Sequence, residues 1–267
     1  MAAVLLGLAI QLALGQAEAR REAAASAAIL SGLESRAVEL AETELQRRDE
    51  QETEALAELA ALPRQRRKVH DAADQPLPLL VNRWNPLPED YEPDLSLVAR
   101  LDNRDYYLDA VCAREYQRMM DDCSAAGGHP YICSAYRSEQ KQKELFDNKV
   151  LRVMILEGAT LQEAPEIAEQ SVARPGTSEH QLGLAVDIID RYYTQLDEGQ
   201  EDTDTQKWLM ENCWRYGFIL RYPNGTTDIT GIIYEPWHYR YVGRAYAEEI
   251  TRMGLTLEEY LELRAGR

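Results

Sequence analysis

The chain has 267 residues, a hydrophobic fraction of 45% and a formal net charge of −17 at pH 7. This length suits one large domain or two small ones, and the apolar fraction is ordinary for a globular protein. The acidic balance argues against nucleic acid as a partner, because nucleic-acid binding needs clustered Lys and Arg, and against simple adsorption to anionic lipid.

An apolar run opens the chain at residues 2–14, and a small-x-small sequence follows at 17–19. This pattern is typical of a secretory signal, although the basic residue that usually precedes the apolar run is missing. The run is shorter than the about 20 residues of a comfortable membrane span. We therefore expect residues 1–19 to be a signal peptide or membrane anchor and the protein to be exported. The alternative is the start of a buried or coiled-coil helix.

Residues 20–75 are rich in Ala, Glu, Arg and Leu. Their apolar side chains recur at roughly helical spacing, without a clean heptad, until Pro63 ends the pattern. We expect a helical spacer here, and the alternative is a partly disordered charged tether. The composition of residues 71–78 is typical of a linker, so the main domain is expected to cover residues 76–267.

Helices and strands are predicted to interleave through the main domain. The expected helices are 106–126, 138–157, 160–172, 205–216, 246–253 and 257–263, and the expected strands are 130–135, 184–189, 218–220 and 232–234. Thr160 is a plausible helix N-cap, since Glu163 follows three residues later. The elements show no regular βαβ period. The sequence therefore predicts an α+β fold with a small, largely antiparallel sheet flanked by helices.

The chain has four cysteines, and none of them lies in a CxxC pair of the kind that binds zinc. Cys112 and Cys123 are expected on one helix, about 16 Å apart along its axis, which is beyond disulfide reach. Cys133 could meet Cys123 across the turn at 127–128. The alternative is that the cysteines are buried free thiols.

Two short segments contain two of the four histidines of the chain. SEHQLGLAVDI at 178–188 contains His180 and Asp187, and EPWHYRYVG at 235–243 contains Glu235 and His238. Two imidazoles and a carboxylate can hold Zn²⁺ and leave its fourth position for water. A free carboxylate nearby can take the proton from that water as it attacks. These residues point to a zinc hydrolase.

The spacing between the candidate ligands favours a turn rather than a helix. His180 and Asp187 would lie about two turns apart on one helix, and Gly183 between them indicates a turn that lets both face one site. Asp187 lies in a strongly apolar run, where a carboxylate is costly unless it is paired or bound to a metal. Spacing also allows Glu235 to be the ligand and Asp187 to lie in the outer shell.

The two segments resemble the signature segments of the D-alanyl-D-alanine carboxypeptidase family of zinc peptidases, the VanY-like group. SAYRS at 134–138 resembles the arginine motif of this family, and LVNRWNPLPEDYEP at 80–93 resembles its entry segment. The resemblance spans roughly residues 79–260. It implies one Zn²⁺ per chain, held by the ligands His180, Asp187 and His238.

The resemblance also implies roles for three further residues. Glu235 would be the general base, and Arg137 would contact the substrate and stabilise the transition state, as a guanidinium beside a carboxylate or an oxyanion can do. Ser178 would bind the substrate. The alternatives are that Arg137 is an exposed surface residue and that Ser178 is a local turn cap.

The implied activity is removal of the C-terminal D-alanine from peptidoglycan stem peptides, by an exported enzyme that we expect to be a monomer. An L,D-carboxypeptidase or a peptidoglycan endopeptidase with the same zinc site is the nearer alternative. A non-catalytic, zinc-stabilised module that binds the cell wall is the more distant one. Glu235 argues against this module, because a pure binder gains nothing from a free carboxylate beside the metal.

Overall fold

The computed structural model describes residues 78–89 and 91–266. The predicted signal peptide or anchor at 1–19 and the predicted spacer at 20–75 lie outside these residues, and both stay predictions. Among the described helices, none is both long enough and apolar enough to cross a lipid bilayer.

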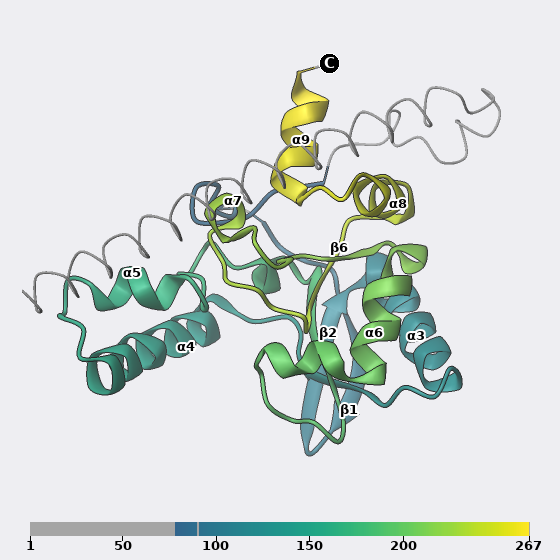
Figure 1. Ribbon diagram of the computed structural model, residues 1–267, viewed down its shortest axis with the longest axis horizontal. Coiled ribbons are helices and arrows are strands. Elements are labelled where there is room, and N and C mark those ends of the chain that lie inside the picture. Colours follow the sequence, from purple (N-terminus) through teal and green to yellow (C-terminus); the bar gives the residue numbers. More distant parts are fainter. Residues whose placement is uncertain (1–77, 90, 267) are drawn as a thin grey trace, which may run out of the picture. The chain divides into compact units, whose positions relative to one another are not determined.

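Two antiparallel sheets form the centre of the fold (Figure 1). The larger sheet has the strand order β3-β4-β6-β5, with β3 at Pro130–Ser134, β4 at Ala185–Asp190, β6 at His238–Tyr241 and β5 at Phe218–Leu220. The smaller sheet is a hairpin of β1 (Leu95–Leu101) and β2 (Arg104–Asp109). With helices around both sheets, the predicted α+β fold with a small antiparallel sheet is confirmed.

The helices pack around the two sheets. The described α-helices are α3 (Ala110–Ala125), α4 (Glu139–Arg152), α5 (Ala164–Glu169), α6 (Asp204–Asn212), α7 (Thr227–Thr230), α8 (Arg244–Met253) and α9 (Leu257–Ala265). Short 3₁₀ or π turns lie at η2 (Val153–Glu157), η3 (Glu179–Leu182), η4 (Glu198–Asp202) and η5 (Cys213–Tyr216). Helices α3 and α6 contact each other beside the sheets, and α4 packs against α5 as a separate pair (Figure 1).

Local hydrogen bonds account for several helix starts. Asp109 accepts a bond from the backbone N–H of Val111 at 3.0 Å and begins α3. Thr160 and Glu163 bond reciprocally, since the Thr160 N–H donates to Glu163 at 3.0 Å and the Glu163 N–H donates to the Thr160 hydroxyl at 3.3 Å. The predicted cap pair is thus confirmed, although the α-helix itself begins only at Ala164.

Two of the predicted elements are wrong. Residues 106–109 belong to a strand rather than a helix, because Asp102 and Asn103 both adopt positive φ (50° and 61°) and form a tight hairpin turn. Residues 232–234 form no strand, and the backbone N–H of Ile233 donates to the Gln170 carbonyl at 2.8 Å instead of to a neighbouring strand. The partner of β5 is β6 at residues 238–241.

The main core lies between the larger sheet and helices α3 and α6. Its fully buried members include Leu108, Met119, Ile132, Val186, Ile188, Leu209, Phe218 and Tyr239. Cys112, Cys123 and Cys213 are buried in the same core, and all four cysteines of the chain are free thiols. The alternative of free thiols is therefore the correct one, and Cys123 and Cys133 are not joined by a disulfide.

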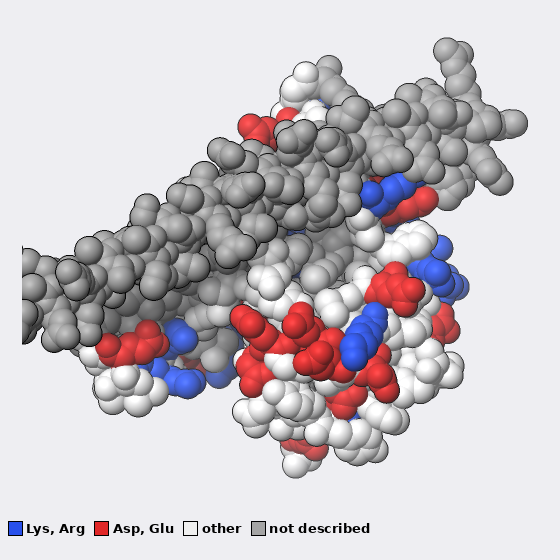
Figure 2. Space-filling view, in the orientation of Figure 1, with Lys and Arg blue, Asp and Glu red and all other residues white. Residues whose placement is uncertain are grey.

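Acidic side chains gather on the face shown in Figure 2, over the region of η4 and α6. The exposed carboxylates of this region are Asp197, Glu198, Glu201, Asp202, Asp204 and Glu211. Such a concentration of one charge creates a negative potential that repels polyanions and attracts cations. The described surface therefore carries a local concentration of negative charge around η4 and α6.

The core predicts how truncations affect stability. Leu209 is fully buried in α6, so we expect Leu209→Ala to lower the free energy of unfolding by about 2–5 kcal/mol. Leu151 on α4 is 53% exposed, and we expect Leu151→Ala to change it by about 0.5 kcal/mol or less. Urea unfolding monitored by circular dichroism measures both values, and equal losses in the two variants would contradict this account of the core.

Candidate functional site

The register of the larger sheet places polar residues from three strands in one row. Asp187 of β4 is paired with His238 of β6 on one side and with Ser134 of β3 on the other. Side chains of directly paired residues project to the same face of a sheet. Asp187 and His238 therefore face each other, and 3.0 Å separates Asp187 Oδ1 from His238 Nδ1.

His180 reaches the same point from the 3₁₀ turn η3. This turn ends at Gly183 in the left-handed region with φ of 72°, so the predicted turn between His180 and Asp187 is confirmed. His180 Nδ1 lies 2.7 Å from the Ala135 carbonyl oxygen. Because a carbonyl can only accept, Nδ1 carries the proton and Nε2 has a free lone pair. That Nε2 atom lies 3.3 Å from Asp187 Oδ2.

His180, Asp187 and His238 form a compact and buried group of potential ligands. One ligand atom from each lies within 4.8 Å of the other two, and the two imidazole rings are 4.9 Å apart and nearly perpendicular. Asp187 Oδ1 is buried without a hydrogen bond from any described residue. Such orphaned polar atoms need a partner. Two imidazoles and a carboxylate at these positions suit a divalent cation, Zn²⁺ above all.

Glu235 lies beside this group and outside the set of three ligand atoms. Its Oε2 atom is 3.7 Å from His238 Nδ1, and the backbone N–H of His238 donates to the Glu235 carbonyl at 3.1 Å, which closes a turn. Burial raises the pKa of the Glu235 carboxyl to about 8. A carboxyl with a pKa in this range can both accept and release a proton near neutral pH, which is the property of a general base.

The two histidines differ in their affinity for protons. Burial and the nearby Arg137 guanidinium lower the pKa of His180 to about 4. Burial also disfavours a charged His238, but the carboxylates of Asp187 and Glu179 outweigh it and raise the pKa of His238 to about 9. At pH 7 the metal-free protein therefore has a neutral His180, whereas His238 must lose a proton before it binds a cation.

Arg137 follows β3 and connects the ligand group to a cavity. Its Nη2 donates to Asp187 Oδ2 at 2.7 Å, its Nε donates to the Ser134 hydroxyl at 2.8 Å, and its side chain is 19% exposed. It is therefore not a free surface arginine, and its contact with substrate stays a prediction. The cavity beside it has a volume of about 380 Å³, and its walls include Tyr91, Tyr136 and Glu139. This volume suits part of a peptide.

Ser178 is buried and occupies the N-cap position of η3, but its side chain makes no capping hydrogen bond. The alternative role as a turn cap is therefore not realised in the structure. Its role in binding substrate stays a prediction.

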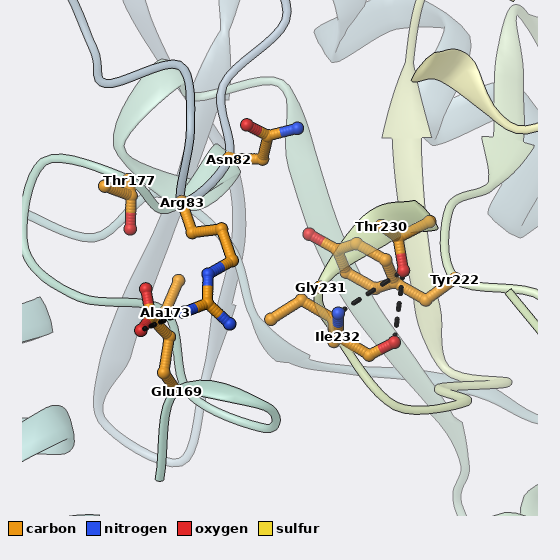
Figure 3. Close-up of a pocket in the computed structure, with 9 residues that line it drawn as sticks. All are labelled: Asn82, Arg83, Glu169, Ala173, Thr177, Tyr222, Thr230, Gly231 and Ile232. Atoms are coloured by element: carbon orange, nitrogen blue, oxygen red, sulfur yellow. Dashed lines mark hydrogen bonds and ion pairs between the residues drawn. The ribbon is translucent and has the colours of Figure 1, made fainter. Parts of the chain in front are cut away.

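A second cavity lies against Tyr222 (Figure 3). It has a volume of about 10 Å³, enough for about one water molecule, and Arg83, Glu169, Thr177 and Tyr222 line it. The ring of Tyr222 lies 4.8 Å from that of His238. Tyr222 thus lines this cavity and also packs against His238.

Sequence reasoning missed the residues that support the ligands from behind. Tyr222 packs against His238, and Glu179 lies 3.6 Å from His238 Nε2. Glu179 was visible in the sequence as a carboxylate directly before His180. Nothing in the sequence, however, indicated that it faces the other histidine. No local signal at all marked Tyr222.

The chain belongs to the VanY family of D-alanyl-D-alanine carboxypeptidases, whose model matches residues 105–244. A D-alanyl-D-alanine carboxypeptidase of Enterococcus faecalis (strain ATCC 700802 / V583) is 44% identical over 184 residues. The match covers 68% of this chain and 65% of that relative, so the chain spans just under two thirds of its length.

Three solved structures are similar to the described fold. VanYB in complex with D-Alanine-D-Alanine has a TM-score of 0.61 and 44% identity, over 68% of this chain and 96% of that one. A glutamate-to-alanine variant of the D,D-pentapeptidase VanY in complex with Zn(II) has a TM-score of 0.60 and 44% identity, over 68% and 97%. The LdcB LD-carboxypeptidase has a TM-score of 0.60 and 39% identity, over 68% and 84%.

The pKa values predict proton release when Zn²⁺ binds the metal-free protein. At pH 7 we expect about one to two protons per ion, because His238 and Glu235 titrate near 9 and 8 and a cation stabilises their deprotonated forms. Release should decline as the pH rises through about 9, since both groups have then already lost their protons. Titration calorimetry in buffers of different ionisation enthalpy counts the protons. Release near zero at pH 7 would contradict these assignments.

Proposed function

We propose that this chain is a zinc-dependent D-alanyl-D-alanine carboxypeptidase that removes the C-terminal D-alanine from peptidoglycan stem peptides. The observation that carries the proposal is the buried group of His180, Asp187 and His238 with Glu235 beside it. Membership in the VanY family supports the same reaction. The solved relatives with Zn(II) and with D-Alanine-D-Alanine support the metal and the class of substrate.

The donor set assigns the metal-binding roles. His180 Nε2, His238 Nδ1 and an Asp187 oxygen would bind one Zn²⁺ per chain, since these atoms converge and Asp187 Oδ1 lacks another partner among the described residues. Zn²⁺ bound here would lower the pKa of a water molecule and polarise the scissile carbonyl. Three protein ligands are the usual number for a catalytic zinc site, because they leave a position open.

The other residues carry the proton and the charge. Glu235 accepts a proton from the attacking water and passes it to the amine of the departing D-alanine. Arg137 lies between the ligand group and the cavity of about 380 Å³, where its guanidinium can stabilise the oxyanion. Ser178 binds the terminal carboxylate of the peptide. The stem peptide lies in the cavity, against Tyr91 and Tyr136.

An L,D-carboxypeptidase is the second candidate. It is favoured by the similarity to LdcB, which at 39% identity is nearly as close as the D,D-peptidases. The same metal, base and arginine would serve both reactions, and the shape of the cavity around the penultimate residue decides between them. A peptidoglycan endopeptidase and a non-catalytic binding module remain outcomes of the substrate test below.

We also propose that the protein is exported and acts outside the cytoplasmic membrane, because its substrate lies there. We expect it to act as a monomer. Residues 1–19 would direct this export and would either be cleaved or stay as a tether to the membrane. The apolar run and the small-x-small sequence support this part of the proposal.

Glu235→Ala tests the chemistry directly. We expect kcat to fall by about 10²–10⁴-fold, because the general base is lost. The variant should still bind one zinc ion per chain, since Glu235 is not a ligand in this proposal. Steady-state kinetics and metal analysis by mass spectrometry give the two values. Loss of zinc together with activity would instead make Glu235 a ligand.

The preference for substrate is tested with the zinc-loaded full chain and three substrates, namely a pentapeptide stem, a tetrapeptide stem and a cross-linked dimer. We expect the pentapeptide alone to lose one alanine, as read by mass spectrometry. Cleavage of the tetrapeptide alone would establish the L,D reaction, and cleavage of the dimer alone an endopeptidase. No cleavage of any of them with zinc bound would favour the binding module.

A further inference from the structure

Glu179 occupies an unusual position behind the ligand group. Its side chain is buried, and its two oxygens have different surroundings. Oε1 accepts from Arg221 Nε at 2.7 Å and from Arg240 Nη1 at 2.8 Å. Oε2 makes no hydrogen bond with any described residue within ordinary distance, and it points toward His238 Nε2, 3.6 Å away.

His238 Nε2 is the matching atom on the other side of this gap. It too is buried and has no other hydrogen-bond partner among the described residues. Nδ1 of the same ring faces the opposite way, toward Asp187 and Glu235 at 3.0 and 3.7 Å. The Nδ1 edge of the imidazole thus meets Asp187 and Glu235, and the Nε2 edge meets a carboxylate oxygen of Glu179.

The two arginines hold Glu179 firmly in place. Arg221 and Arg240 are both fully buried. Glu258 of α9 accepts two bonds from Arg221, at 2.8 and 2.6 Å, and the Leu79 carbonyl accepts one from Arg240 at 2.8 Å. The four charged groups, two arginines and two glutamates, balance to zero. A buried charge is tolerated when it is paired in this way.

Strand geometry brings this cluster to the metal site. Arg240 and His238 are two residues apart on β6, so their side chains project from the same face of the sheet. The backbone N–H of Arg221 donates to the His238 carbonyl at 3.1 Å, just beyond the end of β5. Glu179 directly precedes His180 in the chain, so one short turn positions both a candidate ligand and the carboxylate behind the other ligand.

We propose that Glu179 is a positioning residue for His238. Its Oε2 accepts a hydrogen bond from Nε2–H of His238, and this bond keeps the Nδ1 lone pair directed at the metal. His180 is positioned in the opposite sense, since its Nδ1–H donates to the Ala135 carbonyl and its Nε2 binds the metal. Histidine ligands usually donate their second N–H to such a partner, which fixes the tautomer and the ring orientation. This inference rests on the zinc site of the proposed function.

The direct test is nuclear magnetic resonance of the zinc-loaded full chain with ¹⁵N-labelled histidine. Only four histidines are present, which keeps the spectrum simple. Long-range ¹H–¹⁵N correlations should show His238 with the metal at Nδ1 and the proton at Nε2, and His180 with the reverse. Metal at Nε2 of His238 would overturn the proposal without any variant being made.

Variants then separate positioning from simple structural support. Glu179→Leu removes the acceptor, and we expect zinc binding about 10–100-fold weaker in competition with a chelator. Glu179→Gln keeps a carbonyl oxygen that can accept the same bond, so it should recover part of the lost affinity. The matched control is Glu258→Gln, which weakens the arginine cluster from its far side and leaves Glu179 beside His238. We expect its zinc affinity to stay within about threefold of the wild type, far below the loss expected on removing an outer-shell partner.

Each remaining outcome has a definite meaning. If Glu258→Gln weakens zinc binding as much as Glu179→Leu does, the cluster only supports the fold and the positioning role is wrong. If a folded Glu179→Leu variant binds zinc as tightly as the wild type, or if a folded Glu179→Gln variant recovers none of the affinity that Glu179→Leu loses, the role is also wrong. A wild-type chain that binds no zinc would overturn the metal site itself, and circular dichroism distinguishes that result from failure to fold.

Discussion

The site depends on the burial of one carboxylate. Asp187 lies at the centre of the larger sheet, where an isolated charge would be very costly, and its surroundings are arranged to offset that cost. Arg137 donates to Asp187 Oδ2. His180 Nε2 lies 3.3 Å from the same oxygen, and His238 Nδ1 lies 3.0 Å from Oδ1. The pairing of β4 with β6 determines this geometry, because a slip of one residue would turn Asp187 away from His238.

His238 connects two buried groups of charges. On its Nδ1 side lie Asp187 and Glu235, and Asp187 accepts a hydrogen bond from Arg137, which lines the cavity of about 380 Å³. On its Nε2 side lies Glu179, held by Arg221 and Arg240, and Arg221 also donates to Glu258 of α9. Arg137, which donates to Asp187, connects the ligand group to this cavity, whereas Glu179 and its two arginines are fully buried.

Elements with a strong local signal could be predicted from the sequence, and those defined by a distant partner could not. Strands 130–135, 184–189 and 218–220 and the Thr160–Glu163 cap pair were correct within one or two residues. Residues 106–109 were assigned to the helix that follows them, because the apolar pattern of Tyr106 and Leu108 suits either structure. Their pairing with β1 decided the matter, and this pairing depends on a turn at 102–103 that was not recognised.

The sequence by itself determined the residue types of the site, the α+β class and the family resemblance, because these depend on short motifs and on local periodicity. Only the tertiary structure decided which nitrogen of each histidine faces Asp187, that Arg137 contacts Asp187, and that the cysteines are free thiols. It also brought Arg221, Arg240 and Glu258 together behind Glu179. The physical reason is that spacing along the chain reveals which groups are available, whereas their orientation comes from sheet register and from contacts between distant segments.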